Sequence, residues 1–152
     1  SNLQSNLLFF RTGIKHETAK IHGEGKKSVE KKDKDSSKFI QMYDDIKELG
    51  QLAKKYLSSG NIDEYGATLH EHWLIKTRHS SVTSTKIDEW INEGIKAGAL
   101  GGKIMGAGGG GWFMFYVNKN KNKFRSRMQQ LGLSESLVNF DEEGSKIMLN
   151  LS

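Results

Sequence analysis

The sequence of 152 residues contains no cysteine and no proline. Without cysteine the chain forms no disulfide, holds no iron–sulfur cluster and has no thiol nucleophile. It also lacks any run of about 20 apolar residues, the length that a membrane-spanning helix requires. Residues 1–4 do not show the basic and then apolar pattern of a signal peptide. We therefore expect a cytoplasmic protein that does not bind or cross a membrane.

The charge is positive overall, at +5, but it is unevenly distributed. Residues 23–38 contain six lysines and four acidic residues, and Val29 is the one strong apolar residue among them. A segment with so little apolar surface predicts a solvated, flexible stretch. Nucleic-acid sites usually combine basic residues with aromatic or arginine side chains, which this segment lacks. We therefore predict no nucleic-acid partner.

The apolar pattern predicts four helices, because apolar residues recur every three or four positions. These helices are expected over residues 39–57, 62–79, 85–98 and 124–131. Continuous or alternating apolar runs predict strands over residues 7–10, 103–105, 112–117, 137–140 and 146–151. Trp73, Trp90 and Trp112 each belong to an apolar run and are expected in the core. The order of these elements predicts a single α+β domain with an antiparallel sheet.

Glycine is abundant at one place, between two of the expected strands. Five of six consecutive residues there are glycine: Gly106, Ala107, Gly108, Gly109, Gly110 and Gly111. Glycine weakens regular structure by about 0.5–1 kcal/mol per residue, so such a run indicates positive φ angles or a close backbone approach. Successive N–H groups in such a loop converge on an anion, of which phosphate is the commonest. Lys103, three residues earlier, would add positive charge to this site.

Two common nucleotide motifs do not account for the loop. Gly106, Gly108 and Gly111 match G-x-G-x-x-G, but that dinucleotide motif must open a helix and here a strand is expected next. The Gly-Lys-Ser/Thr ending of a Walker A loop is also missing. The alternative to an anion site is a glycine-rich hairpin that binds nothing, although hairpin turns need only one or two glycines.

The residues of the loop and the strand after it resemble the third motif of the GHMP kinases, the family of galactose, homoserine, mevalonate and phosphomevalonate kinases. The chain looks most like the D-glycero-D-manno-heptose 7-phosphate kinases, and fucose kinases are similar in the same places. The resemblance is carried by residues 7–13, the segment 69–76 (LHEHWLIK), the lead-in 101–103 (GGK), and the segments 140–141 (FD) and 143–145 (EGS).

The resemblance implies a ferredoxin-like C-terminal domain whose glycine loop faces an N-terminal domain that binds ATP with Mg²⁺. The proline-containing Gly-Ser-Ser loop of that N-terminal domain is not found in residues 1–152. The catalytic residues are expected there too, so we predict that this chain alone is inactive. A stand-alone module that binds an anion or forms a homodimer is the alternative function.

Several residues outside the loop are also candidates for the site. Arg11 and Thr12 follow the first expected strand, and Lys76 lies near the end of the second helix, where each could contact a sugar phosphate substrate. His70 and His72 flank Glu71, but they fall on different helical faces and do not form a His-Glu-x-x-His motif. We therefore predict no metal site and expect His70 to form a hydrogen bond in the core.

Overall fold

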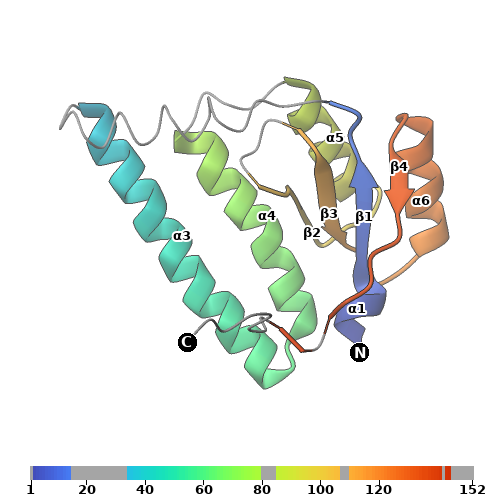
Figure 1. Ribbon diagram of the computed structural model, residues 1–152, viewed down its shortest axis with the longest axis horizontal. Helices are drawn as coiled ribbons and strands as arrows, with labels where there is room; N and C mark the ends of the chain where they lie inside the picture. Colours follow the sequence, from blue (N-terminus) through green and yellow to red (C-terminus); the bar gives the residue numbers. More distant parts are fainter. Residues whose placement is uncertain (1, 15–33, 80–84, 107–109, 142, 145–152) are drawn as a thin grey trace, which may run out of the picture.

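The computed structural model describes residues 2–14, 34–79, 85–106, 110–141 and 143–144. Within these ranges the elements are, in chain order, α1 (Asn2–Asn6), β1 (Leu7–Arg11), α3 (Lys34–Ser59), α4 (Ile62–His79), α5 (Thr85–Lys96), β2 (Gly101–Ile104), β3 (Trp112–Tyr116), α6 (Lys121–Gln130) and β4 (Ser134–Ser136) (Figure 1). The strand predicted over residues 146–151 lies outside the described residues. None of the described helices is long and apolar enough to span a membrane.

The four strands form one antiparallel sheet in the order β2-β3-β1-β4. With helices inserted after β1 and between β3 and β4, this is the β-α-β-β-α-β arrangement of ferredoxin-like folds. The predicted α+β class with an antiparallel sheet is thus confirmed. Strands β2 and β3 form a hairpin, and the glycine loop is their connection.

Alternate residues of the strands face two different helical layers, because successive side chains of a strand point to opposite faces. On one face Phe10, Phe113 and Phe115 pack in a cluster with residues of α5 and α6 such as Ile91 and Phe124. The aromatic rings of this cluster meet edge to face, with Phe115 and Phe124 centroids 5.2 Å apart.

The other face of the sheet is covered by α4. Leu7, Phe9 and Tyr116 pack there against Leu69. In Figure 1, α3 lies alongside α4 on the side away from the sheet. The fold is therefore layered, with α3 and α4 on one side of the sheet and α5 and α6 on the other.

Glycine lets α4 come very close to β2. A Cβ atom added to Gly101 would lie 1.9 Å from the carbonyl oxygen of Gly66 in α4. A Cβ atom added to Gly66 would lie 2.3 Å from the ring of Tyr116. Real Cβ atoms do not occupy such positions, so both glycines are needed for this packing. The Gly101-Gly102 pair begins β2.

The last described strand lies elsewhere than predicted. A strand was expected over residues 137–140, but β4 is Ser134–Ser136, which pairs with β1. Leu137 is 98% exposed, and Val138 and Phe140 are 43% and 42% exposed, so these apolar residues do not enter the described core. Of the segment 23–38, which was expected to be flexible, residues 34–38 belong to α3, and residues 23–33 lie outside the described residues.

Of the three tryptophans predicted in the core, one is on the surface. Trp73 and Trp90 are buried, whereas Trp112 is 45% exposed. Trp112 begins β3 on the face that α4 covers, and α4 packs more over β2 than over β3. Its indole N–H donates a hydrogen bond to Ser136 Oγ at 3.0 Å.

Candidate functional site around the glycine loop

The glycine loop closes the hairpin between β2 and β3. Met105 N donates to Trp112 O at 2.8 Å and so fixes the base of the loop. Three of its glycines are described: Gly106, Gly110 and Gly111 have φ angles of +77°, +152° and +98°. Side chains are strained at these angles, as the glycine content predicts. Ala107, Gly108 and Gly109 lie outside the described residues, and their part in binding stays a prediction.

The second end of the loop is tied to the segment after β1 by Thr12. Its buried hydroxyl donates to Gly111 O and accepts from Gly111 N, each at 3.1 Å, and also accepts from Ile14 N at 3.1 Å. Thr12 N donates to the same Gly111 oxygen at 2.9 Å. The hydroxyl of Thr12 is therefore engaged with the protein, and its geometry supports a role in holding the loop.

The first end of the loop is tied to α4 by Lys76. The ammonium group of Lys76 donates to Gly106 O at 2.8 Å. An ammonium group has three N–H donors, so two more are available for a ligand. The structure thus brings the predicted residues Lys76 and Gly106 together, and it connects the loop to both α4 and β1.

Lys103 joins Lys76 beside the loop, and His72 lies with them. His72 and Lys76 are four residues apart on α4, which places them on one helical face. Burial lowers the pKa of both lysines, and the charge of Lys76 lowers the pKa of Lys103 further. Burial, with the nearby charges of Lys103 and Lys76, lowers the pKa of His72 to about 4. At neutral pH His72 is therefore uncharged between two basic groups.

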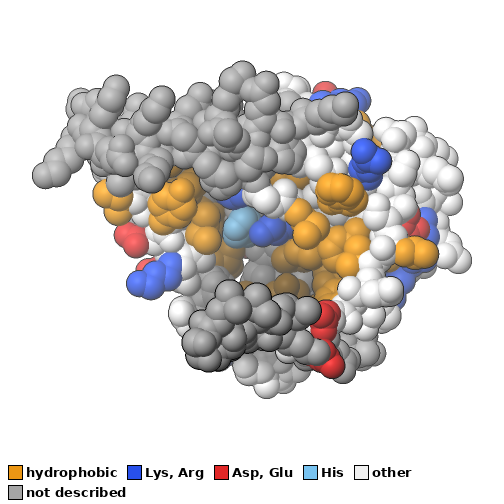
Figure 2. Space-filling view, in the orientation of Figure 1, with side chains coloured by type: hydrophobic (Ala, Val, Ile, Leu, Met, Phe, Trp, Pro, Cys, Tyr) orange, Lys and Arg blue, Asp and Glu red, His pale blue; other side chains and the backbone are white. Residues whose placement is uncertain are grey.

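His72 was not among the residues predicted for the site. The spacing of His72 and Lys76 on one face of a helix was the available signal, but Lys103 is 27 positions further along the chain than Lys76. The packing of α4 on β2, which unites the three, cannot be read from that spacing. Figure 2 shows a hollow between α4 and the sheet in which histidine and basic side chains lie next to hydrophobic ones.

Arg11 lies on the other side of the loop, at the end of β1. It is exposed and pairs in register with Trp112. Its guanidinium carbon is 5.8 Å from the centroid of the Trp112 ring, a cation–π contact. The structure therefore places Arg11 with an exposed aromatic ring next to the loop, and its contact with a substrate stays a prediction.

The histidines of α4 do not assemble a metal site in the part of the chain that the structure describes. No group of three histidine, aspartate or glutamate side chains gathers among these residues. The Nδ1 atoms of His70 and His72 are both buried and have no hydrogen-bond partner among the described residues. The core hydrogen bond expected of His70 is thus not made by its Nδ1 atom.

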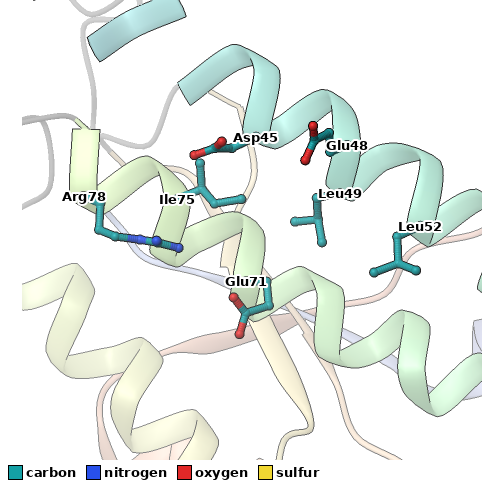
Figure 3. A pocket seen from close by; sticks show the side chains of 7 residues that line it. All are labelled: Asp45, Glu48, Leu49, Leu52, Glu71, Ile75 and Arg78. Atoms are coloured by element: carbon teal, nitrogen blue, oxygen red, sulfur yellow. The ribbon is translucent and has the colours of Figure 1, made fainter. Parts of the chain in front are cut away.

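A separate open groove of about 640 Å³ lies between α3 and α4 (Figure 3). Its polar lining is mostly acidic, with three carboxylates and a single arginine, and its apolar lining comes from both helices. The lining residues are Asp45, Glu48, Leu49, Leu52, Glu71, Ile75 and Arg78. Three carboxylates disfavour a phosphate, so the phosphate-binding candidate is the basic hollow beside the loop.

Comparison with known families agrees with this geometry. Residues 45–132 match the family model described as GHMP kinases C terminal. The chain belongs to this family. The match begins in α3 and ends just after α6, so it includes the glycine loop with Lys76 and Lys103.

Solved GHMP kinases share the fold of this GHMP kinase C-terminal domain. The L. major mevalonate kinase, in complex with R-mevalonate, is 20% identical with a TM-score of 0.72, covering 82% of this chain and 37% of its own. The Lactococcus lactis galactokinase, complexed with galactose, is 18% identical with a TM-score of 0.70, covering 86% and 44%.

A Lin0012 protein from Listeria innocua is also similar, with 14% identity and a TM-score of 0.76, covering 86% of this chain and 38% of its own. The chain therefore spans about two fifths of the length of the solved structures that it matches. A search of curated protein sequences gave no significant match.

Proposed function

We propose that this chain is the C-terminal half of an ATP-dependent sugar kinase that phosphorylates the anomeric hydroxyl of a heptose 7-phosphate. The observation that carries the proposal is a glycine loop held at both ends, by Thr12 at Gly111 and by Lys76 at Gly106, on a GHMP kinase C-terminal fold. The segments 69–76 and 101–103, which resemble heptose 7-phosphate kinases, support this choice of substrate.

The residues of this chain would act by positioning and by electrostatics. ATP, when bound, supplies the γ-phosphoryl group. The loop would direct its N–H groups at phosphoryl oxygens, and because Thr12 and Lys76 already hold its ends, little rearrangement is needed on binding. The ammonium groups of Lys76 and Lys103 would offset the negative charge of the phosphoryl groups. Gly109 and its neighbours would allow the backbone to approach them closely.

Other parts of the reaction are assigned to a partner domain. We propose an N-terminal kinase domain that provides the catalytic residues and most of the ATP site, with residues 1–152 forming the C-terminal domain of a cytoplasmic enzyme. The family uses Mg²⁺, whose preferred ligands are oxygen atoms. Since the described residues bring no three carboxylate or imidazole groups together, no reaction step is assigned to a metal held by them.

The proposal is tested on the intact protein that contains this chain. A phosphorylation screen with heptose 7-phosphate, fucose and galactose should give the highest kcat/KM for heptose 7-phosphate. Preference for fucose or galactose would refute the heptose assignment, and failure to phosphorylate any of the three would refute the sugar kinase.

The loop itself is tested by Gly110→Val. A Cβ atom at Gly110 would lie 2.8 Å from Ile14 O, and φ is +152°, so the loop must change shape. We expect kcat to fall about a hundredfold or more, as it does when oxyanion donors are removed. Gly50→Val in α3, where an added Cβ atom would meet nothing within 4 Å, is the matched control. Normal turnover by a folded Gly110→Val protein, checked by circular dichroism, would contradict the role of the loop.

A second candidate function is a module that binds an anion or forms a homodimer without catalysis. It is favoured by the basic hollow lying wholly within this chain. The intact protein distinguishes the two, because a module without catalysis predicts no sugar phosphorylation by it. From the chain expressed alone we expect no measurable ATP turnover. Robust sugar phosphorylation by the chain alone would refute the need for a second domain.

A further inference from the structure

Three basic side chains converge between α4 and β2, next to the glycine loop. His72 and Lys76 share a face of α4. Lys103 lies two residues after Gly101 in β2, so both are on the sheet face that α4 covers. Because Gly101 packs directly against the backbone of Gly66, this part of β2 lies as near to α4 as backbones allow. Lys103 is thereby brought toward the other two side chains.

The positive charge of this cluster is not compensated within the described residues. Neither Lys76 nor Lys103 forms an ion pair with a carboxylate there, and Lys103 makes no hydrogen bond through its side chain. Burial lowers the pKa of Lys103, and the charge of Lys76 lowers it further. His72 Nδ1 is buried without a partner in the same place. Half-buried charges without a counter-charge and a buried polar atom without a partner are costly, and an anion would offset both.

The charge of the cluster fits a phosphate monoester better than a carboxylate. A phosphate monoester carries about −1.5 to −2 at pH 7 and offers three acceptor oxygens. Two ammonium groups and one neutral imidazole supply the matching charge and donors. A carboxylate, with a single charge, would leave one ammonium group uncompensated.

We propose that His72, Lys76 and Lys103 bind the phosphate monoester of the phosphoryl acceptor, while the glycine loop serves the phosphoryl group in transfer. This inference rests on the proposed function and names the part of the site that selects a phosphorylated sugar. The hydrogen bond from Lys76 to Gly106 O places the two anion sites side by side. Lys76 thus joins them: one of its donors holds the loop and the others face the acceptor.

The first test measures the affinity of the intact protein for heptose 7-phosphate, for the unphosphorylated heptose and for ATP, each added alone. Lys103→Met removes the charge and keeps the length of the side chain, and Lys103→Arg keeps the charge. We expect Lys103→Met to weaken heptose 7-phosphate binding about tenfold to a hundredfold, with the unphosphorylated heptose and ATP bound as before and Lys103→Arg partly restoring affinity. Lys54→Met, an exposed lysine of α3, is the control.

Two results would overturn the inference while leaving a kinase in place. One is an equal loss of affinity for heptose and heptose 7-phosphate in Lys103→Met. The other is a loss of ATP affinity alone, which would assign the cluster to the phosphates of the nucleotide.

A second measurement does not depend on catalysis. Titration with inorganic phosphate, followed by the NMR signals of the His72 ring, should raise the pKa of His72, because the bound anion offsets the two lysine charges. The effect should be much smaller in Lys103→Met. If phosphate leaves His72 unchanged, the anion site is refuted even in an active kinase. A response of His72 in a protein that phosphorylates no sugar would support the anion site and contradict the proposed function.

Discussion

The contact between α4 and β2 is the most severe packing constraint among the described residues, and Gly101→Ala tests it. The added Cβ would lie 1.9 Å from Gly66 O, 2.9 Å from Gly66 C and 3.2 Å from His70 N. Atoms in contact normally lie about 3.5 Å apart, so helix and strand must separate by about 1.5 Å. Both neighbours are backbone, so no side chain can rotate away.

The loss of stability in Gly101→Ala should lie at the upper end of the range for overpacked sites. Such substitutions typically cost about 1–3 kcal/mol, and the backbone clash at Gly101 favours about 3 kcal/mol. The φ angle of Gly101 is not positive, so alanine fits its conformation and regains about 0.5 kcal/mol or more through the unfolded chain. A net loss of about 2–3 kcal/mol follows. For a chain of this size it lowers Tm by about 4–12 °C.

The assay is urea or thermal unfolding followed by circular dichroism, with Gly50→Ala as the matched control. Gly50 lies within α3, is exposed, and has open space around its missing side chain. Alanine there should stabilise the protein by about 0.5–1 kcal/mol. If Gly101→Ala unfolds within about 0.5 kcal/mol of the wild type, as a surface substitution would, then α4 does not approach β2 in this way.

Two further predictions concern the groups around the loop. Because the pKa of His72 falls from 6.5 to about 4 on folding, the unfolded chain binds the proton first and stability should drop as the pH falls from 6.5 through 4. His72 is only half-buried, so we expect the free energy of unfolding to fall by about 1–2 kcal/mol. Denaturant titrations at pH 6.5 and pH 4 should show a smaller fall in His72→Gln than in the wild type. An equal fall in both proteins would exclude His72 as its source. Thr12→Val removes the hydroxyl that bonds Gly111 and Ile14 and should cost about 1–3 kcal/mol, measured by urea unfolding, whereas Thr12→Ser should cost much less. Equal stability of the Val and Ser proteins would show that the hydroxyl does not hold the loop.

The main elements could be predicted because their apolar periods are long and clear. The run from Trp112 to Val117 contains β3, which ends at Tyr116, and the helical stripe of Ile87, Trp90 and Ile91 is buried in α5. Periodicity is an average over a whole element, so it is dependable where an element has many apolar positions facing one layer.

Short polar elements could not be predicted in the same way. Strand β4 has the sequence Ser134-Glu135-Ser136, which carries no apolar signal. It is held by backbone pairing with β1 and by the ion pair between Arg125 and Glu135 at 2.9 Å. Strand β1 is far from β4 in the sequence, and the pair Arg125 and Glu135 belongs to no apolar pattern. Neither interaction can therefore be predicted from periodicity. Helix α1, with five residues, is too short to show a period.

The sequence also did not predict which residues at the ends of strands and helices are exposed. Trp112 belongs to the same apolar run as Phe113, and the run does not show which of the two is exposed. The glycine loop, by contrast, was evident because the composition itself is unusual. What the sequence could not show is how the loop is held: Thr12 is 99 positions away from Gly111 and Lys76 is 30 positions away from Gly106.

The geometry of β2 connects the packing of the fold to the proposed chemistry. Gly101 and Lys103 lie on the same face of this strand, two residues apart, and both face α4. The residue that lets α4 approach therefore also sets how near Lys103 comes to His72 and Lys76. A Gly101→Ala protein that remains folded should bind heptose 7-phosphate more weakly, because the separation of α4 from β2 widens the cluster. Its affinity for the unphosphorylated heptose should change less. Equal losses for both ligands would instead indicate that the substitution disturbs the domain as a whole.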